Sequence, residues 1–172
     1  MAPKLGPMGK FTMTHDLACD PDRFWTLFFD RDFNVKLFAT LEFPEWHIVE
    51  QREEEKEIVR IVRAIPKMEA PAPVAKMLGD RFGYREEGHF DRASKIYKFV
   101  IEPSAMKEKL RNEGTVRCEP AGPGKSKRIV DITAEAKVFG IGGLIESSFE
   151  KSYRTGWGKS AEFFNRWVEE HP

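Results

Sequence analysis

The sequence GIGGLIESSFEKSYRTGWGKSAEFFNRW occupies residues 140–167, near the C-terminal end of the chain. At about 100° per residue, it predicts one long helix over residues 141–168 with a single inward stripe. The stripe consists of Ile145, Phe149, Ser152, Gly156, Ser160, Phe163 and Trp167. The side chains in the middle of the stripe are small, whereas a helix that packs on a sheet needs bulky ones. A glycine such as Gly156 costs about 1 kcal/mol relative to alanine in a helix interior. Because protein interiors are densely packed, this pattern predicts either a hollow or a strand that approaches very closely.

Upstream of this helix, the sequence predicts a strand followed by two short helices. Apolar and polar residues alternate over residues 11–17, which is the period of a half-buried strand. Asp20 followed by Pro21 supplies an N-cap and a first-turn proline for the first helix. The second short helix is predicted over residues 32–41.

The middle of the chain predicts three pairs of strands. They are residues 43–50 with 55–65, 81–90 with 95–102, and 114–119 with 127–138. The charged run QREEEKE, residues 51–57, and the glycine- and proline-rich run PAGPGKS, residues 120–126, are typical of a turn and a loop. Because no helical crossover separates these strands, we predict an α+β protein with one antiparallel sheet.

Length, charge and cysteine content exclude several classes of protein. The 172 residues suit one domain, which we place at residues 9–170, after a flexible N-terminal segment at residues 1–8. Lys plus Arg and Asp plus Glu both total 28, so no basic field favours nucleic acid. Cys19 and Cys118 have neither a zinc-ligand nor a redox spacing, which favours a reducing compartment. Without a signal peptide or a membrane span, we expect a soluble, cytoplasmic monomer.

The order of elements resembles the helix-grip fold of START-related and birch-pollen-allergen-like proteins, the SRPBCC or StARkin superfamily. The resemblance covers nearly the whole chain and rests on FWTLFFD at residues 24–30 and on the Gly-Gly-Leu-Ile-Glu start of the last helix at residues 142–146. It implies a curved antiparallel sheet wrapped around a long C-terminal helix, with two short helices after the first strand. It also implies a cavity between sheet and helix, which this superfamily uses for lipids, sterols, hormones or polyketides. Some members are enzymes, so the fold alone does not decide the function.

The segment PKMEAPAPVAKMLGD, residues 66–80, matches by position a loop that caps the cavity in lipid-transfer members of the superfamily. Met68 and Met77 would give such a lid adaptable apolar contacts, and transient membrane contact through this segment is a further hypothesis. Proline-rich loops of this length are often functional. The alternative is an ordinary loop with a short buried helix.

Polar residues on apolar strands are candidates for contact with a ligand. The strand EIVRIVRAI, residues 57–65, points either Arg60 or Arg63 inward. An inward Arg60 would hold a carboxylate or phosphate group, or would form a structural pair with Glu86, which we favour because buried charges are generally paired within the protein. Tyr84 and Tyr97 would offer hydroxyl groups to a ligand, although core packing explains them equally well.

The sequence offers no catalytic or metal-binding constellation. His15, His47 and His89 lie on different strands without the spacing of a metal pair, and no Ser/His/Asp or Cys/His arrangement can be located. The run Gly-Ile-Gly-Gly at residues 140–143 lacks the Lys-Ser/Thr ending of a phosphate loop and is interpreted as a hinge. We therefore expect no cofactor and no metal.

These observations lead to one principal hypothesis and two alternatives. The principal hypothesis is a non-enzymatic protein that binds, and as a carrier transports, a lipid, fatty acid or sterol beneath the long helix. Its predicted ligand-binding residues are Arg60, Met68, Met77, Tyr84, Tyr97, Phe99, Val130, Ile132, Ala134, Phe149, Ser152, Gly156, Ser160 and Phe163. The first alternative is a polyketide cyclase or aromatase that uses His15, Tyr84, Tyr97 and Arg60 as interior polar groups. The second is an interaction module with a filled core.

Overall fold

A computed structural model describes residues 9–172, and the predicted flexible segment at residues 1–8 lies outside the described residues. The elements are β1 (Lys10–Leu17), α1 (Pro21–Phe28), α2 (Arg31–Thr40), β2 (Glu45–Glu53), β3 (Glu57–Ile65), α3 (Ala72–Leu78), β4 (Tyr84–Asp91), β5 (Ile96–Pro103), β6 (Leu110–Pro120), β7 (Ser126–Ala136) and α4 (Gly142–Glu170). The predicted strand, two short helices, six further strands and long helix are all present, and the structure adds the short helix α3 between β3 and β4.

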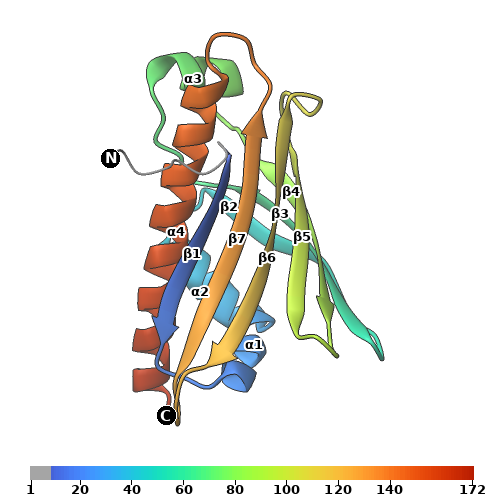
Figure 1. The fold of residues 1–172 in the computed structure, drawn as a ribbon, viewed down its shortest axis with the longest axis vertical. Coiled ribbons are helices and arrows are strands. Elements are labelled where there is room, and N and C mark those ends of the chain that lie inside the picture. The colour runs from blue at the N-terminus through green and yellow to red at the C-terminus, as the bar shows by residue number, and fades with distance from the viewer. Residues whose placement is uncertain (1–8) are drawn as a thin grey trace, which may run out of the picture.

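The strands form one seven-stranded antiparallel sheet in the order β1-β7-β6-β5-β4-β3-β2. Consecutive strands from β2 to β7 pair with one another, with α3 in the connection between β3 and β4, while β1 pairs with β7 in the register Met13 opposite Val130. The sheet curves around α4, which lies along β1 and β7 and spans the length of those strands (Figure 1). The predicted α+β architecture is therefore confirmed.

The two short helices close one end of the curved sheet. Asp20 caps α1 by accepting a hydrogen bond from the Arg23 backbone N–H at 2.8 Å, and Asp30 caps α2 by accepting from Phe33 N–H at 2.7 Å. Such caps satisfy N–H groups that the first turn leaves without partners. Both helices bury phenylalanine side chains against the C-terminal half of α4.

Two strands are longer than the sequence pattern predicts. β2 continues to Glu53, so the charged run forms a turn only at residues 54–56, and the prediction of a turn from residue 51 is wrong. β6 begins at Leu110 rather than near Gly114. Pairing with a neighbouring strand overrides polar sequence here, since β6 is hydrogen-bonded to β7 from Leu110 to Pro120 although residues 111–113 are polar.

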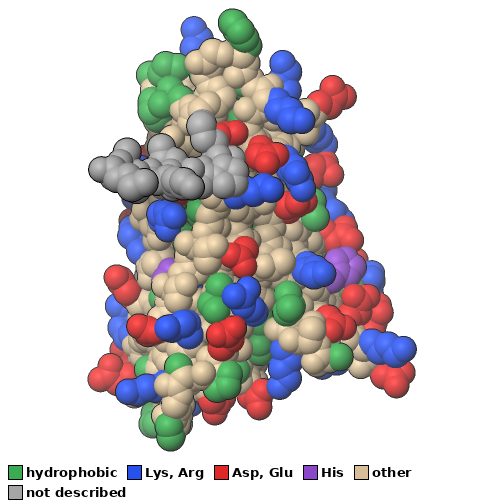
Figure 2. Space-filling view, in the orientation of Figure 1, with side chains coloured by type: hydrophobic (Ala, Val, Ile, Leu, Met, Phe, Trp, Pro, Cys, Tyr) green, Lys and Arg blue, Asp and Glu red, His purple; other side chains and the backbone are tan. Residues whose placement is uncertain are grey.

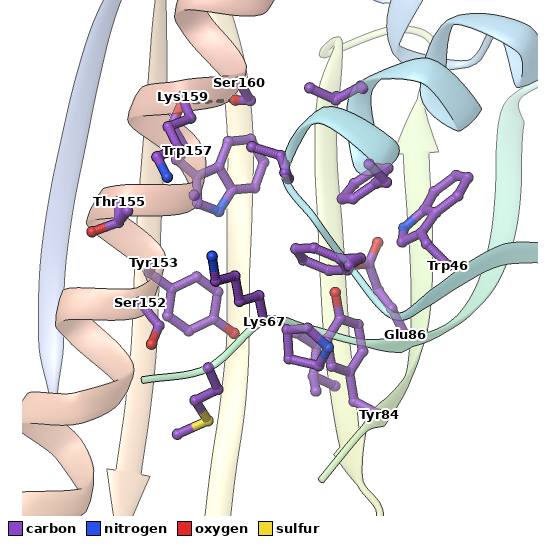
Figure 3. Close-up of a pocket in the computed structure, with 18 of the residues that line it drawn as sticks. Trp46, Lys67, Tyr84, Glu86, Ser152, Tyr153, Thr155, Trp157, Lys159 and Ser160 are labelled. Carbon is purple, nitrogen blue, oxygen red and sulfur yellow. Dashed lines mark hydrogen bonds between the residues drawn. The ribbon is translucent and has the colours of Figure 1, made fainter. Parts of the chain in front are cut away.

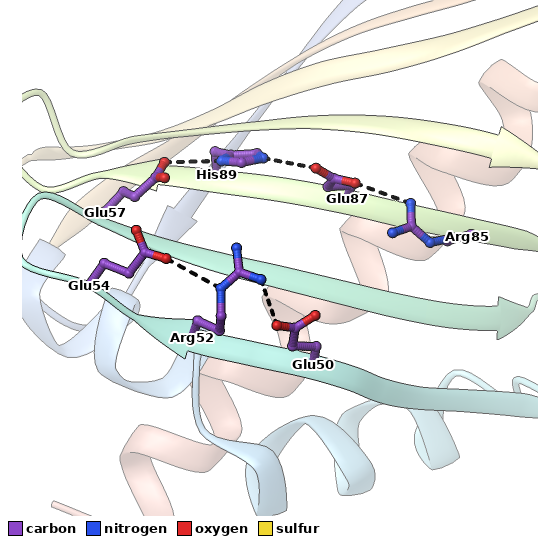
Figure 4. A network of polar contacts seen from close by, with 7 residues as sticks. All are labelled: Glu50, Arg52, Glu54, Glu57, Arg85, Glu87 and His89. Carbon is purple, nitrogen blue, oxygen red and sulfur yellow. Dashed lines mark hydrogen bonds and ion pairs between the residues drawn. The ribbon is translucent and has the colours of Figure 1, made fainter.

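The outer face of the sheet is polar and solvated. His89 on β4 lies 3.0 Å from the Glu57 carboxylate and 3.2 Å from that of Glu87, which also pairs with Arg85 (Figure 4). The Glu57 hydrogen bond is the main cause of a raised His89 pKa. Exposed ion pairs contribute little to stability. Positive and negative side chains are interspersed over the visible face of the molecule (Figure 2).

None of the helices in residues 9–172 combines the length and the apolar character needed to cross a membrane.

Candidate functional site

A cavity of about 320 Å³ lies between α4 and the inner face of the sheet. Tyr153 and Trp157 on α4 face Tyr84, Glu86 and Trp46 on the opposite wall (Figure 3). The cavity occurs where the sheet curves away from α4, since α4 itself packs on β1 and β7 at the other edge. Its volume is at the lower end of the roughly 300–1,000 Å³ typical of small-molecule sites.

Many of the predicted ligand-binding residues line this cavity. They are Arg60, Met68, Tyr84, Tyr97, Phe99, Phe149, Ser152, Gly156 and Ser160. Gly156 lies in the middle of α4, and a Cβ atom added there would meet no heavy atom within 4 Å. The space beside Gly156 is therefore a hollow and not a close approach of helix and strand.

The structure places the other predicted residues outside the cavity. Val130, Ile132 and Ala134 are buried on β7, directly where α4 packs, so their side chains fill the interface instead of facing the hollow. Phe163 belongs to the aromatic cluster at the C-terminal end of α4, with its ring 5.3 Å from that of Phe33. Met77 is 43% exposed on the outer side of α3.

The segment at residues 66–80 contributes to the rim of the cavity. Residues 66–69 line the cavity, including Met68, while α3 buries Val74 and Leu78 in the core. Because these two residues take the inward side of the short helix, Met77 points away. The segment thus combines a cavity-lining loop with the short buried helix that was its alternative interpretation.

Several lining residues were missed from the sequence. They are α2 residues Asn34, Leu37 and Phe38, the following residues Leu41, Phe43 and Trp46, and Tyr153, Trp157 and Phe164 on α4. Phe38 stacks on Trp46 with ring centroids 4.2 Å apart. The α2 residues line the cavity because of tertiary packing, which no local sequence pattern encodes.

Arg60 points into the cavity and pairs with Glu86, as favoured from the sequence. Arg60 is 5% exposed, its Nη1 donates to the Phe28 carbonyl oxygen at 2.8 Å, and its Nη2 lies 3.8 Å from Glu86 Oε1. The Tyr97 hydroxyl donates to the same Glu86 oxygen at 2.7 Å. Gly88 makes this arrangement possible, because a Cβ atom there would lie 1.8 Å from the Tyr97 hydroxyl oxygen.

The tyrosines of the cavity wall stay protonated at neutral pH. Burial is the largest cause that raises the pKa of Tyr84, Tyr97 and Tyr153 above the ordinary value for tyrosine. Tyr153 also donates a hydrogen bond to Asn112 Oδ1 at 2.5 Å. The hydroxyl groups of Tyr97 and Tyr153 thus donate within the protein, whereas the Tyr84 hydroxyl makes no hydrogen bond to residues 9–172 and can donate to a ligand.

Arg128 on β7 is a second arginine in the cavity wall, and it was not predicted. Its side chain is 0% exposed, and its Nη2 donates to the Trp157 carbonyl oxygen at 2.8 Å and to Ser160 Oγ at 3.0 Å. The signal was present in the sequence, because Arg128 has the same strand parity as the inward residues Val130 and Ile132.

His15 on β1 does not line the cavity. Its Nδ1 lies 3.2 Å from Arg128 Nη2 and accepts a hydrogen bond from that group. Burial, and next the charge of Arg128, lower the His15 pKa to about 4. His15 is therefore neutral at pH 7 and serves as a hydrogen-bond acceptor.

Within residues 9–172, no group of three or more His, Cys, Asp or Glu side chains is placed to hold a metal ion. Cys19 and Cys118 are both free thiols.

A protein-family model described as "Protein of unknown function (DUF2505)" matches residues 12–168. The chain belongs to this family. No curated protein matches this DUF2505 chain.

Solved structures with the same fold include a START superfamily protein from Mycobacterium smegmatis, with a TM-score of 0.64 and 12% identity over 92% of this chain and 98% of that one. The Zhui aromatase/cyclase from Streptomyces sp. R1128 gives a TM-score of 0.66 and 13% identity over 95% of this chain and 94% of that one. Norcoclaurine synthase from Thalictrum flavum, solved with dopamine and hydroxybenzaldehyde, gives a TM-score of 0.66 and 14% identity over 96% and 89%. The DUF2505 chain thus has the predicted helix-grip fold.

Proposed function

We propose that this protein binds an apolar or amphipathic small molecule, of the class of lipids, fatty acids and sterols, in the cavity beneath α4, and that it carries this ligand without transforming it. The observation that supports the proposal most strongly is the open space beside Gly156, in the middle of a helix whose two ends are packed. A glycine in this position lowers helix propensity. A ligand that occupies the space gives the position a function.

The chemistry of the cavity wall supports the same class of ligand. Aromatic and aliphatic side chains dominate the lining, and a few polar groups converge on it, which is the usual composition of a small-molecule site. The volume of about 320 Å³ favours one compact ligand over a lipid with two long chains. The filled-core alternative does not fit, because it requires that the space between α4 and the sheet be packed.

A cyclase-like enzyme is the second candidate function, and one arrangement favours it. Glu86 and the Tyr97 hydroxyl are hydrogen-bonded at 2.7 Å in the cavity wall beside Arg60. A carboxylate within reach of a bound ligand is a potential general base. Recovery of the bound ligand chemically unchanged after incubation with the protein supports the carrier, whereas conversion that is lost in Glu86→Gln supports the enzyme.

We further propose that the carrier acts in the cytoplasm as a monomer, with residues 9–170 as one domain, and contacts membranes transiently through residues 66–80. Met77 is exposed on α3, and Phe139 is fully exposed in the loop between β7 and α4, at the same end of the molecule (Figure 1). Exposed apolar side chains of this kind insert into lipid interfaces. The wild-type protein should therefore co-sediment with phosphatidylcholine vesicles more strongly than a Met77→Ser, Phe139→Ser variant, and absence of wild-type binding would remove this proposal.

Native mass spectrometry of the purified protein tests the principal proposal, followed by organic extraction and identification of what is released. A stoichiometric lipid-like adduct is the expected result and would name the class of ligand. An adduct that is polar and water-soluble would contradict the proposal.

A further inference from the structure

Arg128 has fewer partners than a buried arginine needs. Its guanidinium group carries five N–H donors, yet all of its hydrogen bonds within residues 9–172 come from Nη2. The Nε atom is buried without an acceptor. Within residues 9–172, Nε and Nη1 of Arg128 thus make no hydrogen bond, although the residue lies in the cavity wall.

The charge of Arg128 also lacks a counter-ion. No carboxylate of residues 9–172 forms an ion pair with it, whereas Arg60 has Glu86. Its neighbours are instead the rings of Trp157, Phe164 and Phe24, whose centroids lie 4.8, 5.8 and 6.0 Å from Arg128 Cζ. An uncompensated charge in such surroundings is strongly unfavourable, and burial accordingly lowers the Arg128 pKa to about 9.

The cavity as a whole carries excess positive charge, although the chain has a formal net charge of +0. Its lining contains the cations Arg60, Lys67, Arg128, Lys151 and Lys159 but only the carboxylates Glu69 and Glu86. Glu86 balances Arg60, and Lys67 pairs with Glu42 outside the cavity. Lys151 and Lys159 are exposed on the rim, where they would attract an approaching anion.

We infer, on the basis of the proposed function, that the natural ligand is a monoanionic carboxylate with an apolar body, and that Arg128 binds its carboxylate. A carboxylate matches the planar fork of the guanidinium group. One negative charge neutralises the one buried charge that lacks a partner, whereas a dianionic phosphate would leave a buried negative charge uncompensated.

A purely structural role for Arg128 is the competing explanation, because Nη2 links β7 to the Trp157 carbonyl on α4. That link uses a single nitrogen and requires no charge, so a neutral donor would serve it equally. The structural role therefore leaves the charge unexplained, and the two explanations differ in their consequences for ligand preference.

Calorimetric titration with decanoate and 1-decanol, which share a chain and differ in charge, separates these explanations. We expect the wild type to bind decanoate at least about tenfold more tightly than 1-decanol. Arg128→Met should lose this preference while its affinity for 1-decanol changes by less than about threefold. The matched control Lys127→Met removes an exposed charge next to Arg128 on β7 that does not line the cavity, and should keep the preference.

Each other result has a distinct meaning. Equal wild-type affinities for the two probes, or an unchanged preference in a folded Arg128→Met protein, would overturn the inference and leave the proposed function standing. Absence of binding of either probe to the wild type would overturn both. If Arg128→Met does not fold, the Arg128 Nε–H resonance of ¹⁵N-labelled wild type replaces it: a shift with decanoate but not with 1-decanol supports the inference, and an unmoved signal contradicts it.

Discussion

The space beneath α4 is filled at its C-terminal end and hollow in its middle. At the filled end, the ring of Phe33 lies 4.5 Å from that of Phe164 and 5.3 Å from that of Phe163, and Phe33 is 0% exposed. In the middle, Ser152 and Gly156 present little volume to the cavity. One helix therefore holds the fold together at one end and forms the wall of a binding site further along. The two parts of the helix differ in the volume of their inward side chains, and the small residues lie where the sheet curves away from α4.

The largest expected effect is at the filled end. Phe33→Ala removes a fully buried ring and should lower the free energy of unfolding by about 3–5 kcal/mol, which is the usual cost of a cavity made in a core. Phe38→Ala, on the next turn of α2 but facing the cavity and half-buried, should cost less than half as much. Chemical denaturation of both variants measures the difference. Equal costs would mean that the two regions are packed alike.

The two buried arginines of the cavity wall differ in their partners, since Arg60 pairs with Glu86 and Arg128 pairs with no carboxylate of residues 9–172. Glu86→Gln leaves Arg60 without its carboxylate and should lower the free energy of unfolding by about 1–3 kcal/mol. Arg128→Met should change it by less than about 1 kcal/mol or raise it, because the methionine removes a buried charge that has no counter-ion. The same denaturation experiment checks both, and a loss at Arg128 as large as the loss at Arg60 would show that the protein itself satisfies Arg128.

A smaller effect concerns pH at the boundary between the two regions. The folded-state pKa of His15 is about 4 against 6.5 ordinarily, so between these values the unfolded chain binds a proton that the folded chain does not. Stability should therefore fall as the pH is lowered from 7 to 4. His15→Asn keeps an acceptor for Arg128 and does not titrate. Between pH 7 and pH 4, the free energy of unfolding of this variant should fall by about 1–2 kcal/mol less than that of the wild type, a moderate difference because His15 is only half-buried. Denaturation at pH 7 and pH 4.5 gives both slopes, and identical slopes would exclude His15 as the cause.

The sequence was sufficient for the fold because local signals agreed with tertiary structure. Strand alternation around Met13, the cap at Asp20 and the helical period after Gly142 all predicted elements that the structure contains. The errors lie where pairing with a neighbouring strand overrides the sequence pattern. Gln51 and Arg111 have polar side chains that do not indicate a strand, yet both residues are paired with a neighbouring strand.

The site was less predictable, for two physical reasons. The inward face of α4 rotates along its length, so a fixed helical phase selected Phe163 instead of Phe164 and missed Trp157. The sheet also leaves the helix beyond β7, so burial at Val130 did not mean contact with the cavity. Arg128 was predictable in principle, because it has the same strand parity as Val130 and Ile132.

The smallest stability effects belong to the two glycines of α4 and give matched variants. Gly156→Leu and Gly158→Leu should each raise the free energy of unfolding by about 0.5–1 kcal/mol, because leucine has the higher helix propensity. A Cβ atom at either position meets nothing within 4 Å, but only Gly156 lines the cavity. A large stability loss in either variant, measured by thermal unfolding, would contradict the open surroundings described for both.

The most direct test of whether the hollow beneath α4 is the binding site is the uptake of 1-decanol. One titration series compares these two variants with the wild type. Gly156→Leu should be folded and bind at least about tenfold more weakly than the wild type, because its side chain occupies the space of the ligand. Gly158→Leu should bind as the wild type does. Unchanged uptake in a folded Gly156→Leu protein, or an equal loss in both variants, would contradict the location of the site.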